Sequence, residues 1–459
     1  MVDGTLDDPD YLRKAIEFFE KFQWLYTLPT TKVLSPGALD EFPPDWLDSL
    51  RNIEIDKLNN LVAKKQIKVV LPETLNNFIV KCKKFDKLPV QEISPGPQQL
   101  PKVFAKFMSD KKKHEIYNLS RVINDHCRSS NISLIIDLGA GLGYIGQLLH
   151  HLYGYKVLAL ESRQKNIDTA RNRQNQYFPE SKGSVKYVCC NVTKDSLDEL
   201  ENILKTEFSE SSDEKVCLIG LHACGDLSVY MSNLYLNMKQ AHLFILVSCC
   251  YHKLEQETTY ETGSSENCFK GFPLSNILKN AVKKSHADVG KLFGRTFMRL
   301  ACQETPDRWE NMSEQAHGEH AFHVLARAVL EQYTSESGFR LKKHVCKATR
   351  KTQCVDFESY LKDSMNRYSL LESESDKVIP WTEEIEESIK RLWKEKSSRQ
   401  KDVELYTGLQ YLLQNAAESL VLVDRLFYLK ENSVDSCLLP TMNRSLSPRC
   451  YAIVSTKKN

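Results

Sequence analysis

The chain has 459 residues, with 62 lysines and arginines against 60 aspartates and glutamates, and 14 cysteines. This length is enough for two or three domains. The balanced charge provides no strong overall field for nucleic acid, so any contact with RNA would need a local basic patch. The cysteines are too sparse for a disulfide scaffold, and we expect mostly free thiols in a reducing compartment.

The sequence predicts neither a secretory signal nor a membrane span. The N-terminus is acidic and lacks the apolar core of a signal peptide. The apolar run 419–429 carries Asp424 and Arg425 in its middle and falls short of the roughly 18 residues that a span needs. We therefore expect a soluble protein of the cytoplasm or nucleus that does not insert into membranes.

The N-terminal region, residues 1–105, is predicted to be helical. Apolar residues recur at helical spacing from Tyr11 to Tyr26, and residues 94–101 resemble a linker. Ser109 or Asp110 can then cap a further helix. The basic residues 111–114 could meet a phosphate or a cofactor carboxylate, although composition alone favours a solvent-exposed first turn.

A glycine turn organises the chain. The buried-strand pattern 134–138 is followed by Gly139, Gly141 and Gly143, and then by an apolar helical pattern. Strand, glycine turn and helix form the layout of a nucleotide-binding crossover, in which the backbone approaches the ligand. A tight turn without ligand is the plainer alternative, but three alternating glycines cost backbone entropy that such a turn need not lose.

The same turn fits two cofactor motifs. Residues 141–146 match the dinucleotide pattern GxGxxG, which is a weak signal alone. Residues 137–143, Asp-Leu-Gly-Ala-Gly-Leu-Gly, resemble motif I of class I S-adenosylmethionine methyltransferases. In that family the acid two positions before the first glycine lies near the methionine end of the cofactor, so Asp137 favours the methyltransferase interpretation.

Further strands and helices alternate along the chain. The second strand ends at Glu161, about twenty residues after the turn, where a carboxylate should hold the ribose hydroxyls. Asn191, after the third strand, stands where methyltransferases often place a polar residue beside adenine. Alternating strands and helices imply a parallel, doubly wound sheet that binds ligands beyond the carboxyl ends of its strands. The predicted strands are 134–138, 155–161, 185–191, 216–221 and 243–248.

Two polar loops follow the fourth and fifth strands. They contain five soft or basic side chains, namely His222, Cys224, Cys249, Cys250 and His252. Zinc accepts such ligands, but the spacings are not of the paired CxxC type, and we assign no metal ligands. A histidine general base is the more economical hypothesis. The candidate catalytic residues, expected around the transferred group, are His222, Asp226, Cys250 and His252, and a structural role stays equally open for either histidine.

The remaining chain predicts a large insertion and a completed sheet. Residues 255–430 are mostly helical by pattern, and 431–459 contain two apolar runs typical of strands. We predict an α/β, Rossmann-like sheet over 106–254, parallel with one antiparallel strand, completed by 431–459. The helical segment 255–430 then lies between strands five and six as a lid or substrate platform.

The chain resembles the methyltransferase-like 25 family through motifs spread over nearly its whole length, weakest before about residue 100. They are Lys112-Lys-His-Glu115, Gly220-Leu-His-Ala-Cys-Gly-Asp-Leu-Ser228, Cys249-Cys-Tyr-His252, Asp424-Arg-Leu-Phe-Tyr-Leu429 and Ser447-Pro-Arg-Cys-Tyr451. Some relatives are labelled rRNA adenine dimethylase-domain proteins. The fourth-strand loop here departs from the Asn/Asp-Pro-Pro-Tyr/Phe type that holds an exocyclic amine. The loops more distantly resemble tRNA 2′-O-methyltransferases.

The resemblance implies an S-adenosylmethionine-dependent methyltransferase acting on RNA or protein. The expected cofactor-binding residues are Asp137, Gly139, Gly141, Gly143, Glu161 and Asn191. Two other functions stay open: a non-catalytic binding or interaction module with the same fold, and an NAD-dependent oxidoreductase.

Overall fold

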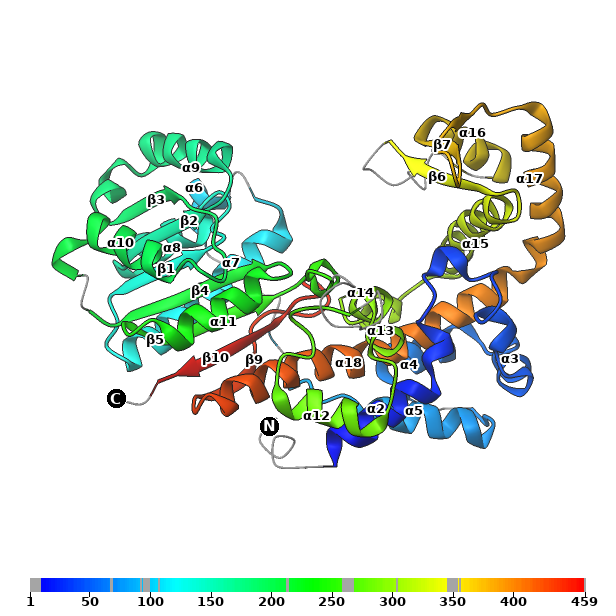
Figure 1. Cartoon of the computed structure of the whole chain (residues 1–459), viewed down its shortest axis with the longest axis horizontal. Coiled ribbons are helices and arrows are strands. Elements are labelled where there is room, and N and C mark those ends of the chain that lie inside the picture. Colours follow the sequence, from blue (N-terminus) through cyan, green and yellow to red (C-terminus); the bar gives the residue numbers. More distant parts are fainter. Residues whose placement is uncertain are drawn as a thin grey trace. The chain divides into compact units, whose positions relative to one another are not determined.

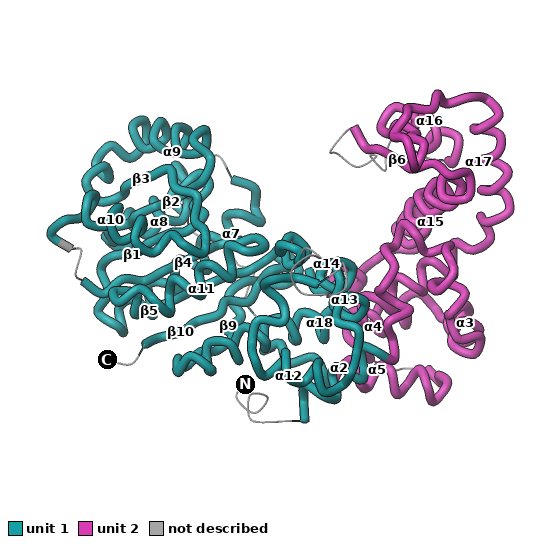
Figure 2. Tube along the Cα trace, in the orientation of Figure 1, with its two compact units in different colours: residues 1–20, 84–305, 414–459 teal, residues 21–83, 306–413 magenta. Residues whose placement is uncertain are grey.

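The protein is described by a computed structural model over residues 10–66, 69–90, 93, 100–105, 108–211, 214–257, 268–302, 304–344, 354 and 356–457. Most of the expected linker 94–101 and of the polar loop 255–267 lies outside the described residues. The chain divides into two compact units (Figure 2). Unit 1 comprises residues 1–20, 84–305 and 414–459, and unit 2 comprises 21–83 and 306–413. The sequence analysis divided the chain into consecutive segments according to predicted helices and strands. These two units instead group separate segments that pack against one another.

Unit 1 is built on a seven-stranded sheet of order β3-β2-β1-β4-β5-β10-β9 (Figure 1). Strands β1 to β5 pair in parallel, and β10 runs antiparallel to both of its neighbours. The predicted Rossmann-like fold is thus confirmed. The strands are β1 (Leu134–Leu138), β2 (Lys156–Glu161), β3 (Val185–Cys189), β4 (Val216–Ala223), β5 (Ala241–Ser248), β9 (Asp435–Pro440) and β10 (Tyr451–Thr456).

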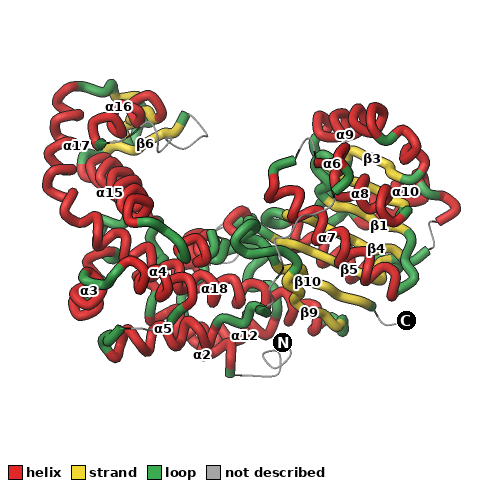
Figure 3. The backbone as a smooth tube through the Cα atoms, turned by 180° about the vertical axis from the view of Figure 1, so that it is seen from behind, coloured by secondary structure: helices red, strands yellow, loops and turns green. Residues whose placement is uncertain are grey.

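The central strands are buried because their side chains are apolar on both faces. All five residues of β1 are buried, as parallel strands covered on both sides require. Helices α7 to α11 connect and cover these strands, as the secondary-structure view also shows (Figure 3). The helices of unit 1 are α2 (Tyr11–Lys21), α6 (Lys102–Ala105), α7 (Asp110–Ser129), α8 (Tyr144–Tyr153), α9 (Gln164–Tyr177), α10 (Leu197–Glu207), α11 (Leu227–Asn237), α12 (Asn276–Ser285), α13 (Val289–Leu292) and α14 (Arg295–Leu300).

Helix α18 (Gln400–Glu431) contributes residues to both units. Within unit 1, its buried Asp424 accepts hydrogen bonds from the backbone N–H groups of Leu274 and Ser275, at 2.8 and 2.9 Å. Arg425 donates to the carbonyl of Gly271 at 2.8 Å. The two charges that interrupt this apolar run therefore hold the segment that leads into α12. Among the described residues, no helix combines the length and apolar character needed to cross a membrane.

Unit 2 is helical with one small sheet. In it, the rings of Phe357 and Trp393 stack with centroids 4.3 Å apart. The sequence did not predict the antiparallel sheet, whose strands are β6 (Phe339–Lys343), β7 (Tyr368–Glu372) and β8 (Val378–Ile379). These strands are short, and β6 carries three charges, so they lack a clear alternating pattern. The helices are α3 (Pro44–Arg51), α4 (Ile55–Lys64), α5 (Glu73–Phe85), α15 (Glu314–Glu336), α16 (Phe357–Arg367) and α17 (Glu383–Lys396).

The C-terminal strand β10 lies inside the sheet, between β5 and β9, and its Ile453 is 1% exposed. We predict that Ile453→Asp lowers the free energy of unfolding by several kcal/mol, because it buries an unpaired charge. Thr456→Asp, on the exposed end of the same strand, serves as the control and should change stability by less than about 1 kcal/mol. Denaturant unfolding measures both, and equal effects would show that β10 is not part of the core.

Candidate functional site

The glycine turn leaves β1 with all three glycines at positive φ, between 58° and 78°. A side chain at Gly143 would collide with Tyr187, because its Cβ would lie 2.2 Å from the tyrosine ring. At Gly141, by contrast, no heavy atom of the described residues lies within 4 Å of the Cβ position. The backbone is therefore open at Gly141, where a ligand can approach it.

Glu161, at the end of β2, is fixed against the turn. Its Oε2 accepts the backbone N–H of Gly141 at 3.0 Å, and its Oε1 accepts from the backbone of Arg163 and the side chain of Asn166, both at 3.1 Å. Since an ionised carboxylate offers about four acceptor positions, acceptor capacity remains on Oε2. Asn191 follows β3 and is exposed.

Asp137, in β1, is a buried acid with an unsatisfied oxygen. The residue is 1% exposed, and its Oδ2 has no hydrogen-bond partner among the described residues. Burial raises the pKa of Asp137 to about 7, and the nearby charge of Glu161 adds to the rise. A buried acceptor of this kind is costly unless a donor reaches it, so it fits a ligand that brings an N–H group.

Two cations cover the aromatic ring that follows the turn. The Nζ of Lys112 lies 4.1 Å and the guanidinium carbon of Arg173 lies 3.8 Å from the ring centroid of Tyr144. Arg173 also donates to the carbonyl of Leu142 at 2.6 Å. The expected exposed first turn is found at Lys111, whereas Lys112 is half-buried. Burial lowers the pKa of Lys112, and the charge of Arg173 lowers it further.

His222, which the sequence placed in the loop after the fourth strand, lies within the last residues of β4 and is paired with a buried carboxylate. Its Nε2 lies 2.9 Å from Oε2 of Glu115, whose Oε1 accepts the hydroxyl of Ser447 at 2.7 Å. Burial alone would raise the pKa of Glu115, but the hydrogen bonds from His222 and Ser447, together with positive charge at His222 and Lys111, hold the pKa below its ordinary value. Ionised Glu115 only accepts, so Nε2 carries the proton of this contact, and in the neutral form of the imidazole Nδ1 is the acceptor.

The backbone of His222 is strained, with φ of +62°. This left-handed conformation is rare outside glycine and costs about 1–3 kcal/mol in a non-glycine residue. The parallel register of β4 and β5 is also interrupted between Leu221 and Ala223, at the position of His222. The side chain stays 36% exposed.

The other three catalytic candidates make protein contacts of different kinds. Asp226 accepts the backbone N–H of Glu255 at 2.9 Å and thereby joins the two polar loops. The Nδ1 of His252 lies 3.0 Å from the sulfur of Cys302. Burial lowers the pKa of His252, and nearby positive charges, of Arg299 first, lower it further.

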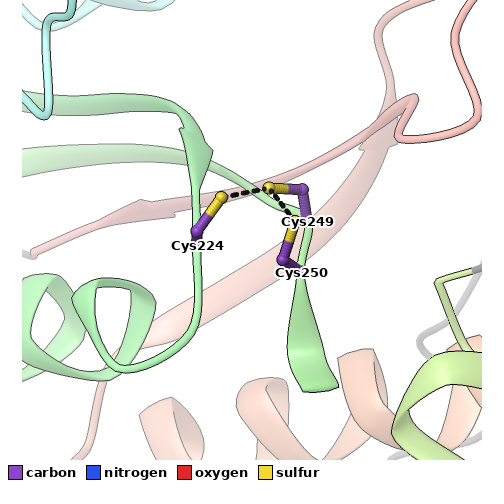
Figure 4. A group of neighbouring side chains, drawn as sticks. All are labelled: Cys224, Cys249 and Cys250. Atoms are coloured by element: carbon purple, nitrogen blue, oxygen red, sulfur yellow. Dashed lines mark hydrogen bonds between the residues drawn. The ribbon is translucent and has the colours of Figure 1, made fainter. Parts of the chain in front are cut away.

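Cys250 belongs to a cluster of three thiols (Figure 4). The sulfur of Cys249 lies 3.0 Å from that of Cys224 and 3.6 Å from that of Cys250. A hydrogen bond from Cys249 lowers the pKa of Cys224 to about 5, and the shared proton raises the pKa of Cys249. The structure thus brings together three of the five soft or basic side chains of these loops, while both histidines have other partners.

Sequence reasoning did not identify four residues of this site as functional. Tyr187 and Arg173 support the glycine turn, and Glu115 and Ser447 position His222. Glu115 and Ser447 are separated by 332 positions but both fall in motifs quoted above for the resemblance. Their pairing could have been suspected from those motifs, whereas no local pattern distinguishes Tyr187 or Arg173.

Comparison with known proteins agrees with this geometry. Residues 111–257, from the start of α7 through both polar loops, match the family described as "Methyltransferase domain". The chain carries a methyltransferase domain. It is also similar to "Probable methyltransferase-like protein 25" of Mus musculus, at 28% identity over 251 residues, which are 53% of this chain and 38% of that protein. The Homo sapiens protein of the same name is 29% identical over 276 residues, which are 58% and 40% of the two chains.

The chain is thus similar to the methyltransferase-like 25 proteins, and the resemblance stated from the motifs is confirmed. The matched part spans about two fifths of the length of these relatives. The matched domain contains the glycine turn, Glu161, His222 and the three thiols, but not Ser447.

The strained backbone of His222 leads to a prediction. His222→Ala and His222→Gly both remove the imidazole, but only glycine relaxes at positive φ. We expect the glycine variant to be more stable than the alanine variant by about 1 kcal/mol. Thermal unfolding of the two proteins measures the difference, and equal stability would show that residue 222 is not held in the left-handed conformation.

Proposed function

We propose that this protein is an S-adenosylmethionine-dependent methyltransferase that acts on an RNA or protein acceptor. The main support for this proposal is Oδ2 of Asp137, which is buried without a hydrogen-bond partner among the described residues and lies beside an open glycine turn. The cofactor's methionine end carries an ammonium group, which is the kind of donor that this oxygen lacks. Support for the reaction class comes from the methyltransferase domain over residues 111–257.

The chain offers partners for three parts of the cofactor. Asp137 would accept from the ammonium, Glu161 would hold the ribose hydroxyls with its remaining acceptor capacity, and Asn191 would lie beside the adenine. Gly141 leaves the backbone open between them, with Gly139 and Gly143 completing the turn. When bound, the cofactor supplies an electrophilic methyl group on a sulfonium sulfur.

His222 is the best-supported proton acceptor. Glu115 fixes the imidazole through Nε2, which leaves Nδ1 to take a proton from an acceptor hydroxyl or amine. Ionised Glu115 also stabilises the imidazolium that forms. Asp226, Cys250 and His252 stay candidates around the reacting group, and the contacts of Asp226 favour a positioning role.

The cation pair on Tyr144 supports an anionic acceptor. Lys112 and Arg173 place two positive charges beside the glycine turn, in a chain whose overall charge is nearly balanced. Such a patch can contact a phosphate of RNA or an acidic segment of protein. The role of the helical segment 255–430 as a lid or substrate platform stays a prediction.

Methyl transfer tests the proposal. Wild type is incubated with labelled S-adenosylmethionine and fractionated cell RNA and protein, and we expect label in one fraction. His222→Ala should stay folded and bind S-adenosylhomocysteine in calorimetry, yet lose at least about 100-fold in transfer rate, because it removes the proton acceptor and not the donor site. His252→Ala, assayed in parallel, should lose less.

The outcomes distinguish the alternatives. Binding of S-adenosylhomocysteine without label in any fraction would favour a non-catalytic module. Binding of NAD but of neither adenosyl compound would favour an oxidoreductase. Wild-type transfer by His222→Ala would place the proton acceptor elsewhere.

A further inference from the structure

We propose that Cys224, Cys249 and Cys250 bind one zinc ion, with the fourth coordination position open to water. The sequence alone assigned no metal ligands. Zinc binding at these thiols is independent of whether the protein transfers methyl groups. Its basis is geometric: three sulfurs from two separate loops lie within 4.8 Å of one another (Figure 4).

The sulfur separations suit a metal better than a disulfide. Zinc with bonds of about 2.3 Å in tetrahedral geometry holds its sulfur ligands about 3.8 Å apart. The three thiols span that value, from 3.0 Å between Cys224 and Cys249 to at most 4.8 Å within the group. A disulfide would join two of the sulfurs at about 2.05 Å and leave the third without a role.

The two loops are held together independently of the sulfurs. A Cβ at Gly225 would lie 2.6 Å from the carbonyl oxygen of Lys253, so a glycine is needed for this close approach. Asp226 adds the hydrogen bond to the backbone of Glu255, and buried Tyr251 donates its hydroxyl to Glu418 at 3.4 Å. The thiols are therefore positioned before any ion binds, which reduces the ordering cost of binding.

Two of the three thiols are only partly buried, so an ion can reach the group from solvent. Cys249 is buried, whereas Cys224 and Cys250 are partly exposed. Among the described residues the group contains no fourth histidine, cysteine or carboxylate donor. Zinc sites with three protein ligands and an open position are the kind used in catalysis, so the fourth position would be taken by water or by an acceptor group. Cys127 and Cys217, also close together, are fully buried and lack a third donor in the described part of the chain.

The test measures metal binding to the 459-residue protein, reduced and stripped of metal under anaerobic conditions. Zinc is titrated in competition with a chromophoric chelator, and Co²⁺ is used as a spectroscopic probe. We expect one Zn²⁺ per chain, and a near-ultraviolet thiolate-to-Co²⁺ charge-transfer band. Cys250→Ser should bind zinc at least about 100-fold more weakly and lose part of the band. Each zinc ion should release protons as the thiols ionise.

Cys437→Ser is the matched control, because it removes an exposed thiol from β9 and should bind zinc as wild type does. Circular dichroism and thermal unfolding verify that each variant is folded, and Cys224→Ser replaces Cys250→Ser if the latter is not. The proposal is wrong if wild type shows no charge-transfer band, or if the cluster variants bind zinc as tightly as the control. It is also wrong if Cys224 and Cys249 form a disulfide in air and the reduced protein takes up no metal.

Discussion

The buried carboxylate of Glu115 joins three parts of unit 1 that are far apart in sequence. It belongs to α7, accepts from Ser447 just before β10, and orients His222 near the end of β4. Because the residue is 3% exposed, loss of either partner would leave one carboxylate oxygen with fewer donors in the interior and would lower stability. The same interaction therefore stabilises the junction between the parallel strands and the C-terminal strands. It also fixes the imidazole of His222, whose backbone is strained. This coupling is why the residues outside the matched domain matter to the site.

The two acids at the carboxyl ends of β1 and β2 differ in how many hydrogen bonds their oxygens accept. Glu161 accepts three N–H groups, whereas one oxygen of Asp137 accepts none among the described residues. The folded-state pKa of Asp137 is about 7, above its ordinary value, so ionisation opposes folding and stability is lost as pH rises from about 4 through about 7. An acid that costs stability near neutral pH is typical of a ligand site.

Much of the fold and part of the candidate site could be predicted from the sequence, for identifiable physical reasons. Apolar runs bounded by turns gave all seven strands of the main sheet, and the glycine pattern located the turn. The antiparallel β6–β8 sheet was missed because β6 is charged and partly exposed, whereas β7 and β8 are too short to show a clear alternation. The pairing of Glu115 with His222 and Ser447, and the convergence of Cys224 with Cys249 and Cys250, depend on tertiary contacts. Cys224 and Cys249 are 25 positions apart on different loops, and no spacing rule predicts that such residues meet. The sequence therefore suggested these thiols as a group but could not predict that their sulfurs are in contact.

The central claim is that Asp137 provides the unsatisfied oxygen for the ammonium group of the cofactor. The direct measurement is the dissociation constant of S-adenosylhomocysteine from about pH 5.5 to about pH 7.5, for wild type and Asp137→Asn. Only ionised Asp137 attracts the ammonium, so wild-type affinity should rise toward tenfold per pH unit below the pKa of about 7 and then level off. Asp137→Asn should bind more weakly at about pH 7.5 and lack this rise. Parallel pH profiles for the two proteins would contradict the account.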